Sequence, residues 1–238
     1  MWSEIVVVKP SRRLRDIYSS IDRTKLSSIP EAIQIIKFNS RVKFNETVEM
    51  SVNLGINPKR SEQMIRGVVS LPYGTGKTVR VAVFAKDFEA KEARLAGAEV
   101  VGAEDLIEEV QNGRIDFNRV IATPEMMVMV SKLGKVLGPR GLMPNPKFKT
   151  VTQNTAEAVR FAKAGQLEFR VEKAGIVHAG IGKVRFPENH LVDNAKAFVN
   201  AIIIAKPLGL KGSYIKRISI SSTMGPSIKI DSGVLNIA

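Results

Sequence analysis

The stretch VRVAVFAKDFEAKEARLAGAEVVG, from Val79 to Gly102, decides the fold class of this chain of 238 residues. Its first part, residues 79–85, is apolar and rich in β-branched side chains, which predicts a strand. Residues 86–96 predict a helix that Gly97 ends, and residues 100–101 predict a second short strand. Strands that alternate with helices of this length are typical of βαβ units and of a parallel sheet.

The same alternation continues on the C-terminal side of this stretch. Residues 104–112 predict a helix closed by a glycine, residues 120–122 a strand, and residues 124–133 a helix with a proline in its first turn. The sequence SKLGKVLGPRGLMPNPK at 131–147 then predicts a turn-rich loop, because glycine and proline punctuate it densely. A further helix is predicted over residues 156–164. The middle of the chain is therefore predicted to be a small Rossmann-like domain.

Both ends of the chain show the alternating pattern of antiparallel strands instead. From residue 43 to residue 54, apolar and polar side chains alternate, which predicts a strand with one buried and one wet face. Residues 166–171 alternate in the same way. The other elements predicted at the two ends are helices at 30–36 and 188–205 and strands at 65–71, 176–179, 183–186, 214–220 and 227–230.

The predicted fold class is therefore α/β with two domains. Residues 1–73 and 166–238 are expected to form one discontinuous α+β terminal domain, because the strand patterns of the two ends resemble each other in kind. Residues 74–165 are expected to form the Rossmann-like βαβ domain inserted in it.

Composition points to a polyanionic partner. The formal net charge is +13, and the two terminal segments together carry +10 of it against +3 in residues 74–165. A basic surface gains affinity for nucleic acid by releasing condensed counterions. The chain has no cysteine and two histidines, so we expect no disulfide, thiol catalysis, zinc site or other cofactor. No apolar run approaches the roughly 18 residues of a membrane span, so no membrane partner is expected.

The sequence GTGKT at Gly74 to Thr78 imitates a phosphate-binding loop. The GxxxxGK[ST] pattern requires a glycine where this chain has Leu71, and it requires a helix next, whereas residues 79–84 predict a strand. The alternative is a nucleotide-dependent enzyme. Binding of ATP or GTP that is lost in Lys77→Ala would support this alternative. Because His178 has no evident nucleophile beside it, we expect no enzyme and no small-molecule substrate.

Three segments of the predicted terminal domain are candidates for RNA contact. The sequence SSTMGP at 221–226 offers small hydroxyls, a thioether and a glycine that permits close backbone approach; its alternative is a tight turn. Lys43 with Phe44 suits a phosphate contact plus stacking, and its alternative is a core phenylalanine. Residues 170–178 form a charged, hairpin-like segment whose alternative is a solvated turn.

Motifs along most of the chain resemble one family. The stretches are VKFNETVE at 42–49, LGPRGLMPNPK at 137–147, AKAGQ at 162–166 and STMG at 222–225. Together with shorter matches in the same order, from about Pro30 to Ile230, they resemble large-subunit ribosomal protein one, the L-one stalk protein, in its bacterial form.

This resemblance implies a structural protein that binds large-subunit rRNA, forms a mobile stalk, assists release of deacylated exit-site tRNA, and represses translation of its own mRNA. The RNA-binding residues that we expect are Lys43, Phe44, Glu49, Arg170, Lys173, His178, Ser222, Thr223, Met224 and Gly225. The expected ribosome is cytoplasmic, with a mitochondrial matrix ribosome as the alternative because residues 12–20 are rich in arginine and serine. A standalone RNA chaperone or regulator is the other alternative, and it would not co-sediment with large subunits.

Overall fold

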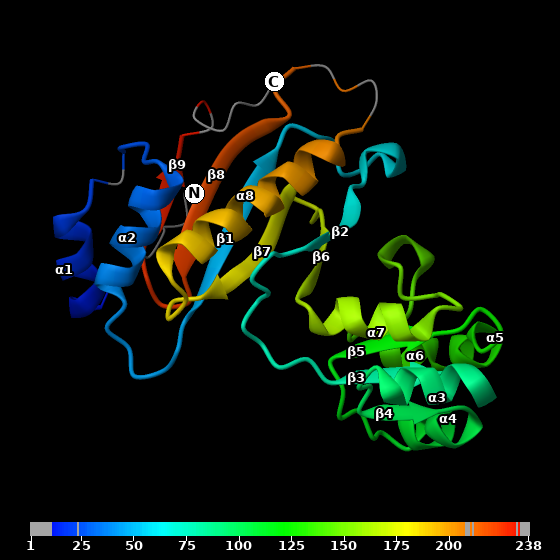
Figure 1. Cartoon of the computed structure of the whole chain (residues 1–238). Helices are drawn as coiled ribbons and strands as arrows, with labels where there is room; N and C mark the ends of the chain where they lie inside the picture. The colour runs from blue at the N-terminus through cyan, green and yellow to red at the C-terminus, as the bar shows by residue number, and fades with distance from the viewer. Residues whose placement is uncertain (1–10, 23, 208–209, 211, 232, 234–238) are drawn as a thin grey trace, which may run out of the picture.

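The structure is a computed structural model that describes residues 11–22, 24–207, 210, 212–231 and 233 (Figure 1). It is a mixed α/β fold, which confirms the predicted class. Within these residues no helix is long and apolar enough to cross a membrane. The first ten residues, on which part of the expectation about compartment depends, lie outside the described residues.

The helices are α1 (Arg12–Ser20), α2 (Ile29–Asn39), α3 (Asp87–Leu95), α4 (Glu104–Gln111), α5 (Met127–Val130), α6 (Gly134–Leu137), α7 (Thr155–Lys163) and α8 (Glu188–Ile204), with short 3-10 turns η1 (Ser61–Gln63), η2 (Ser131–Leu133) and η3 (Pro146–Phe148).

Elements from the two ends of the chain build one antiparallel sheet. Its strand order is β7 (Ile176–Lys183), β1 (Thr47–Leu54), β8 (Ile215–Ser222) and β9 (Ser227–Ile230). Helix α8 lies across one face with α2 beside it (Figure 1). The apolar residues of β1 point to this face and are all buried, as the alternation predicts: Val48, Met50, Val52 and Leu54. We call these elements, with α1 and the antiparallel pair of β2 (Arg66–Ser70) and β6 (Gln166–Arg170), the terminal group.

Local sequence accounts for α2, the helix that starts this packing. Ser28 is its N-cap, and the Ser28 hydroxyl accepts from the amide of Glu31 at 3.4 Å while the Glu31 carboxylate accepts from the amide of Ser28 at 3.2 Å. This capping box satisfies two amides that a helix start otherwise leaves unpaired, and Pro30 suits the first turn because its missing N–H is not needed there.

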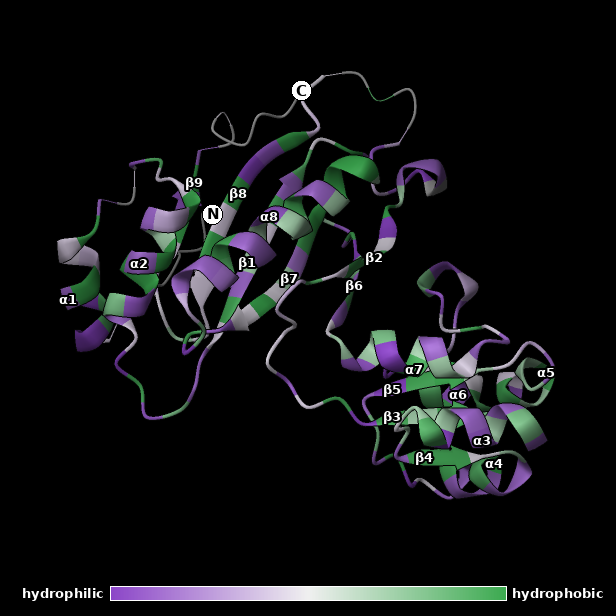
Figure 2. Ribbon diagram, in the orientation of Figure 1, coloured by the Kyte–Doolittle hydropathy of each residue, from purple (hydrophilic) through white to green (hydrophobic). Residues whose placement is uncertain are grey.

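The middle of the chain forms a second body, the middle group, whose sheet is parallel. Its order is β4 (Val100–Gly102), β3 (Val81–Phe84) and β5 (Arg119–Ala122), with β3 in the centre and all four of its residues buried. Helices α3 and α7 pack beside each other over this sheet. Figure 2 shows the strands of this group mostly in green, as expected for a sheet covered on both faces. The parallel order confirms the βαβ prediction.

Apolar clusters follow the same grouping. One cluster contains buried residues from 29–71 and 169–230, and two others contain buried residues from 81–162 only. Strands β2 (Arg66–Ser70) and β6 (Gln166–Arg170) form a separate antiparallel pair whose inner residues belong to the first cluster. This distribution supports the predicted domains, whose limits at 73 and 166 remain our proposal.

Two predictions about elements are wrong, and one helix was not predicted. One strand, β7, covers the strand predicted at 176–179 and ends at Lys183; it follows β1 to Thr47 through a bulge at Val48 and Glu49. Residues 184–186, predicted as the rest of a second strand, form a turn and a bend instead. The single helix predicted at 124–133 begins at Met127 and runs through a 3-10 turn into α6, so helical turns extend to Leu137 before the loop begins. Helix α1 was not predicted, because arginine and serine dominate the segment, although Leu14, Ile17 and Tyr18 recur at helical spacing.

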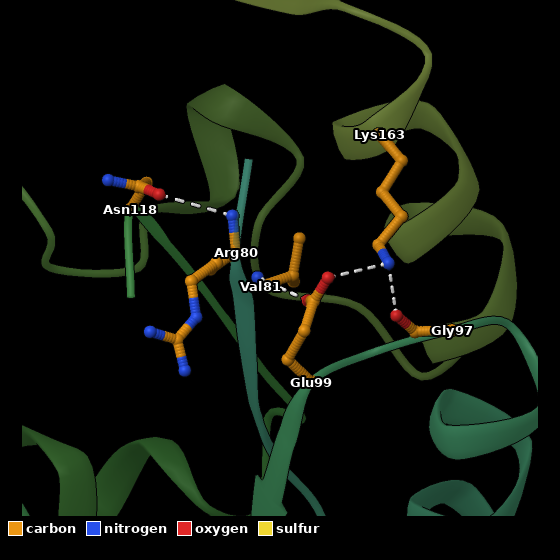
Figure 3. Close-up of polar contacts among 6 residues, drawn as sticks. All are labelled: Arg80, Val81, Gly97, Glu99, Asn118 and Lys163. Atoms are coloured by element: carbon orange, nitrogen blue, oxygen red, sulfur yellow. Dashed lines mark hydrogen bonds and ion pairs between the residues drawn. The ribbon is translucent and has the colours of Figure 1, made fainter. Parts of the chain in front are cut away.

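The amino end of β3 is fixed by Glu99, which accepts a hydrogen bond from the Val81 amide at 2.8 Å and from Lys163 Nζ at 2.8 Å (Figure 3). Lys163 also donates to the Gly97 carbonyl, and Asn118 Oδ1 accepts from the Arg80 amide at 3.1 Å. Partial burial opposes ionisation of Glu99, but the bonds from Lys163 and Val81 outweigh it, so the pKa of Glu99 lies below its ordinary value of 4.5.

We expect Glu99→Gln to reduce the acid sensitivity of folding. A carboxylate whose pKa is lower in the folded state contributes stability that is present above its unfolded pKa, near 4.5, and is lost as pH falls through the folded value. The midpoint of urea unfolding, measured from pH 6 down to about pH 3, should therefore fall less steeply in Glu99→Gln than in the unchanged protein. The matched control is Glu125→Gln at an exposed position. If the unfolding midpoint falls equally steeply with pH in Glu99→Gln and Glu125→Gln, the lowered pKa of Glu99 is contradicted.

Candidate nucleic-acid interface

The face of the four-stranded sheet opposite α2 and α8 is polar. Residues that are directly opposite across strands share one face, so the register places His178, Ser51 and Ser219 in one cross-strand row with Lys229 at its end. The next row toward the β8–β9 turn contains Gly180, Glu49, Ser221 and Ser227. We call this surface the open face. Hydroxyls, one imidazole and cations on a twisted sheet suit the minor groove and phosphates of a folded RNA.

The turn after β8 closes one end of the open face. Thr223 and Met224 form the turn, and Met224 is 49% exposed. The Thr223 hydroxyl accepts from the Thr47 amide at 3.0 Å and donates to the Thr47 carbonyl at 3.3 Å, while the Thr223 amide donates to the same carbonyl at 3.1 Å. Thr223 therefore fixes the turn to the start of β1, and its neighbour presents the thioether to solvent.

Ser222 and Gly225 explain the shape of this turn. The Gly225 amide donates to the Ser222 carbonyl at 3.1 Å, and a Cβ on Gly225 would lie 2.2 Å from the Ser222 hydroxyl oxygen. Glycine is needed there because of this close approach, not because of its φ. The Ser222 side chain is buried, and its hydroxyl has no hydrogen-bond partner within the described part of the chain. Ser222 thus packs under the turn rather than facing a ligand.

Lys43 and Phe44 lie in the loop before β1, at the same end of the sheet as the turn. Lys43 is exposed and Phe44 is 53% exposed, so Phe44 is not a core residue. Glu49 is exposed in the row next to this end. The structure thus brings Lys43, Phe44, Glu49, Thr223, Met224 and Gly225 to one end of the open face, although the chain separates the two segments by more than 170 residues.

The charged segment after β6 is a hairpin turn, as predicted. The Gly175 amide donates to the Glu172 carbonyl at 2.9 Å, and Lys173 is exposed in the turn. His178 is exposed on the open face, with its Nε2 3.9 Å from a Glu172 carboxylate oxygen. Arg170 lies elsewhere, on the β2–β6 pair. The segment therefore divides between two surfaces.

Sequence reasoning missed two contributors. Arg13 of α1 donates from Nη2 to the Met224 carbonyl at 2.8 Å, which places the unpredicted helix against the turn. On the open face, a hollow is lined by Arg217 and Lys229 together with the hydroxyl residues Thr24, Ser219 and Ser227. The period-2 alternation of residues 214–220 was the signal that could have identified Arg217 and Ser219.

The GTGKT segment does not have the form of a phosphate loop. It is irregular and leads into strand β3 instead of a helix, so no helix N-terminus follows it in the chain. A Cβ on Gly76 would lie 2.8 Å from the Phe186 ring, which gives this glycine a packing role. Among the described residues, no group of three or more histidine, aspartate or glutamate side chains could hold a metal ion.

A comparison with protein families gives an independent result. The model described as the ribosomal protein L1p/L10e family matches residues 35–226, which is more than half of the chain.

Proposed function

The chain belongs to the ribosomal protein L1p/L10e family, and we propose that it binds large-subunit rRNA through the open face and the turn at Thr223 to Gly225. Membership makes it a structural, RNA-binding ribosomal protein, and the family is not one of enzymes. The observation that supports the location is the register of the sheet, because it gathers hydroxyls and cations on the face that no helix of the described residues covers, with the exposed Met224 in the turn at its end.

In this proposal recognition is by shape. Ser51, Ser219 and Ser221 can donate to and accept from ribose 2′-hydroxyls, while Glu49 can accept hydrogen bonds from 2′-hydroxyls or base amino groups. Lysine and arginine, including Arg217 and Lys229, add salt-dependent contacts to phosphates. Phe44 is exposed enough to stack on a base.

We further propose the finer roles that the family resemblance implies. The terminal domain, residues 1–73 and 166–238, would hold the rRNA, and the domain of residues 74–165 would move about the two crossing segments to form a mobile stalk. Release of exit-site tRNA would use this movement. Repression of the protein's own mRNA would use the same open face. The supporting observation is that only two chain segments connect the groups, at residues 71–80 and 163–166.

The test is a filter-binding titration against a folded stalk fragment of large-subunit rRNA and a duplex of the same length, over a salt series. We expect a preference for the fragment that persists at high salt, because hydroxyl and stacking contacts are not screened as phosphate contacts are. Equal binding to both RNAs that high salt abolishes would mean that the surface is basic without being selective.

We expect deletion of residues 74–165 to change the affinity for the stalk fragment by no more than about threefold relative to the full chain. A tenfold change corresponds to about 1.4 kcal/mol, so the expected loss of binding free energy is smaller than that. A short glycine linker can replace them, because Ser70 and Gln166 are cross-strand neighbours and a Cβ on Gly165 would lie 2.3 Å from Gly74 Cα. Circular dichroism establishes that the truncation is folded, and filter binding measures its affinity. Loss of specific binding by a folded truncation would refute both the domain limits and the location of the site.

A further inference from the structure

One arginine of the middle group contacts the terminal group. Arg119 is the first residue of β5, and its side chain is 14% exposed. Its Nη2 lies 3.5 Å from Glu168 Oε1, and its Nη1 donates to Gln166 Oε1 at 3.1 Å. Among the described residues, this is the one ion pair that joins the two groups. The contact therefore depends on how the groups are oriented.

The sequence of β6 explains why both acceptors meet one arginine. Gln166 and Glu168 are two residues apart in the strand, so they lie on the same face of it. Leu167 and Phe169 on the other face pack on the apolar cluster of the terminal group. A guanidinium presents several donors in a fixed plane, so Arg119 can bind both oxygen atoms at once.

Partial burial makes this ion pair easy to separate. The Glu168 side chain is 29% exposed, and burial raises the pKa of Glu168 above its ordinary value of 4.5 although the charge of Arg119 opposes that shift. Burial likewise lowers the pKa of Arg119. Each charge has thus lost water that its partner replaces only in part, and both charges regain water when the groups separate.

The ion pair lies beside the first crossing segment, residues 71–80. This segment is fixed to α8 where it leaves the terminal group: the Tyr73 and His190 rings are stacked with centroids 3.7 Å apart, and Asn194 Nδ2 donates to the Gly74 carbonyl at 2.9 Å. At the other end of the segment, the Arg80 carbonyl accepts from the Arg119 amide at 3.2 Å. A rotation of the middle group would therefore occur between Gly74 and Arg80, next to the ion pair.

The surroundings of the ion pair are not packed like a core. A hollow beside it is lined by Leu142 and Met143 of the middle group and by Leu167 of β6. Interfaces between domains that are polar and incompletely packed usually permit movement. The orientation of the two groups therefore depends on a few polar contacts, of which this ion pair is the charged one in the described part of the chain.

We propose that Arg119, Glu168 and Gln166 form an ionic lock that holds the middle group in the orientation of this structure and releases it when the pair separates. The lock rests on the proposed movement of residues 74–165, and it adds what sets the resting position. All three residues belong to this chain, so the lock acts in the free protein. Removal of one charge favours the open form, because the remaining charge gains water only when the groups separate.

The experiment measures single-molecule energy transfer on the full chain without RNA. Because the chain has no cysteine, Leu95→Cys in α3 and Asn200→Cys in α8 place one dye at an exposed position of each group (Figure 1). The lock variants, made in this labelled protein, are Arg119→Gln, Glu168→Gln and the double variant with both substitutions. Circular dichroism establishes that each variant is folded.

The matched control is Arg114→Gln. Arg114 Nη1 lies 3.0 Å from Glu109 Oε2, so this substitution also breaks an arginine–glutamate pair, but the pair is exposed and lies inside the middle group. The control should show the same ratio of open to closed molecules as the unchanged protein, because neither partner contacts the terminal group through this pair.

We expect the ratio of open to closed molecules to rise at least about fivefold in each single variant. The double variant should open no more than either single variant, because no unpaired charge stays buried in it. Equal ratios for the unchanged protein and both single variants would overturn the proposal. Effects that add in the double variant would overturn it as well, since the two side chains would then act independently.

The lock and the proposed movement fail in different ways. A single transfer efficiency, equal in the unchanged protein and in every variant, would reject both of them. Two efficiencies whose ratio no lock variant changes would reject the lock alone. RNA binding by the open face is measured separately in the filter titration, and the three lock residues lie outside that face.

Discussion

Asn194→Ala is expected to lower the free energy of unfolding by about 3 kcal/mol, since three backbone groups lose their partner. The Asn194 side chain is fully buried in α8; its Oδ1 accepts from the Tyr73 amide at 3.1 Å, and its Nδ2 donates to the carbonyls of Gly74 at 2.9 Å and Ile181 at 2.8 Å. Alanine would leave the Ile181 carbonyl unpaired away from water, and the part-buried Tyr73 amide and Gly74 carbonyl would lose their partner. Asn194 thus ties the first crossing segment to the helix and to β7.

The control for this variant is Asn200→Ala, at an exposed position of the same helix, which should change stability by less than about 0.5 kcal/mol. Urea unfolding gives the two free energies. Limited proteolysis adds a local measurement, because a released crossing segment at residues 72–77 should be cut faster in Asn194→Ala. Similar unfolding midpoints for the two variants would show that this side chain does not anchor the segment.

Met224→Asp is expected to reduce affinity for the stalk fragment about 100-fold, which corresponds to about 2.8 kcal/mol. The substitution removes an exposed thioether at the end of the open face and puts a carboxylate where phosphates approach, so it combines lost contact with charge repulsion. Stability should change little, since the side chain is 49% exposed and the Met224 carbonyl still accepts from Arg13.

Two further variants make this result specific. Val128→Asp adds the same charge at a residue that is 76% exposed in α5, and it should bind the fragment like the unchanged protein. Met224→Leu keeps an apolar side chain of similar size and should stay within about threefold of the original affinity, because it introduces no charge. If Met224→Asp and Val128→Asp bind equally well, the turn does not contact RNA.

Sequence patterns predicted the elements whose burial is periodic. The alternation from residue 43 to 54 identified β1 and its wet face, and the glycines after three helices of the middle region marked where each helix stops: Gly97, Gly113 and Gly165, all of which have positive φ. Helix α1 and the α5–η2–α6 run were predicted poorly, because short or polar helices depend on their contacts more than on their own pattern.

The candidate site was predicted in part. Exposure of Phe44 and Met224 and the hairpin at 172–175 agree with the expected roles, which stay predictions until binding is measured. The roles of Ser222 and Thr223 inside the turn were not evident, because a hydroxyl in a sequence does not reveal whether protein or ligand uses it. The Arg13 contact was missed because 211 residues separate Arg13 from Met224, so no local pattern connects the two.

By itself the sequence determined the α/β class, the parallel middle sheet, the basic charge and the family resemblance. These follow from local periodicity, composition and motifs, which each short segment carries on its own. The tertiary structure alone decided that His178, Ser51, Ser219 and Lys229 form one row and that Arg66 is opposite Arg170. The physical reason is that strand register is set by packing and hydrogen bonding between segments distant in the chain, and a shift of one residue would turn every side chain to the other face.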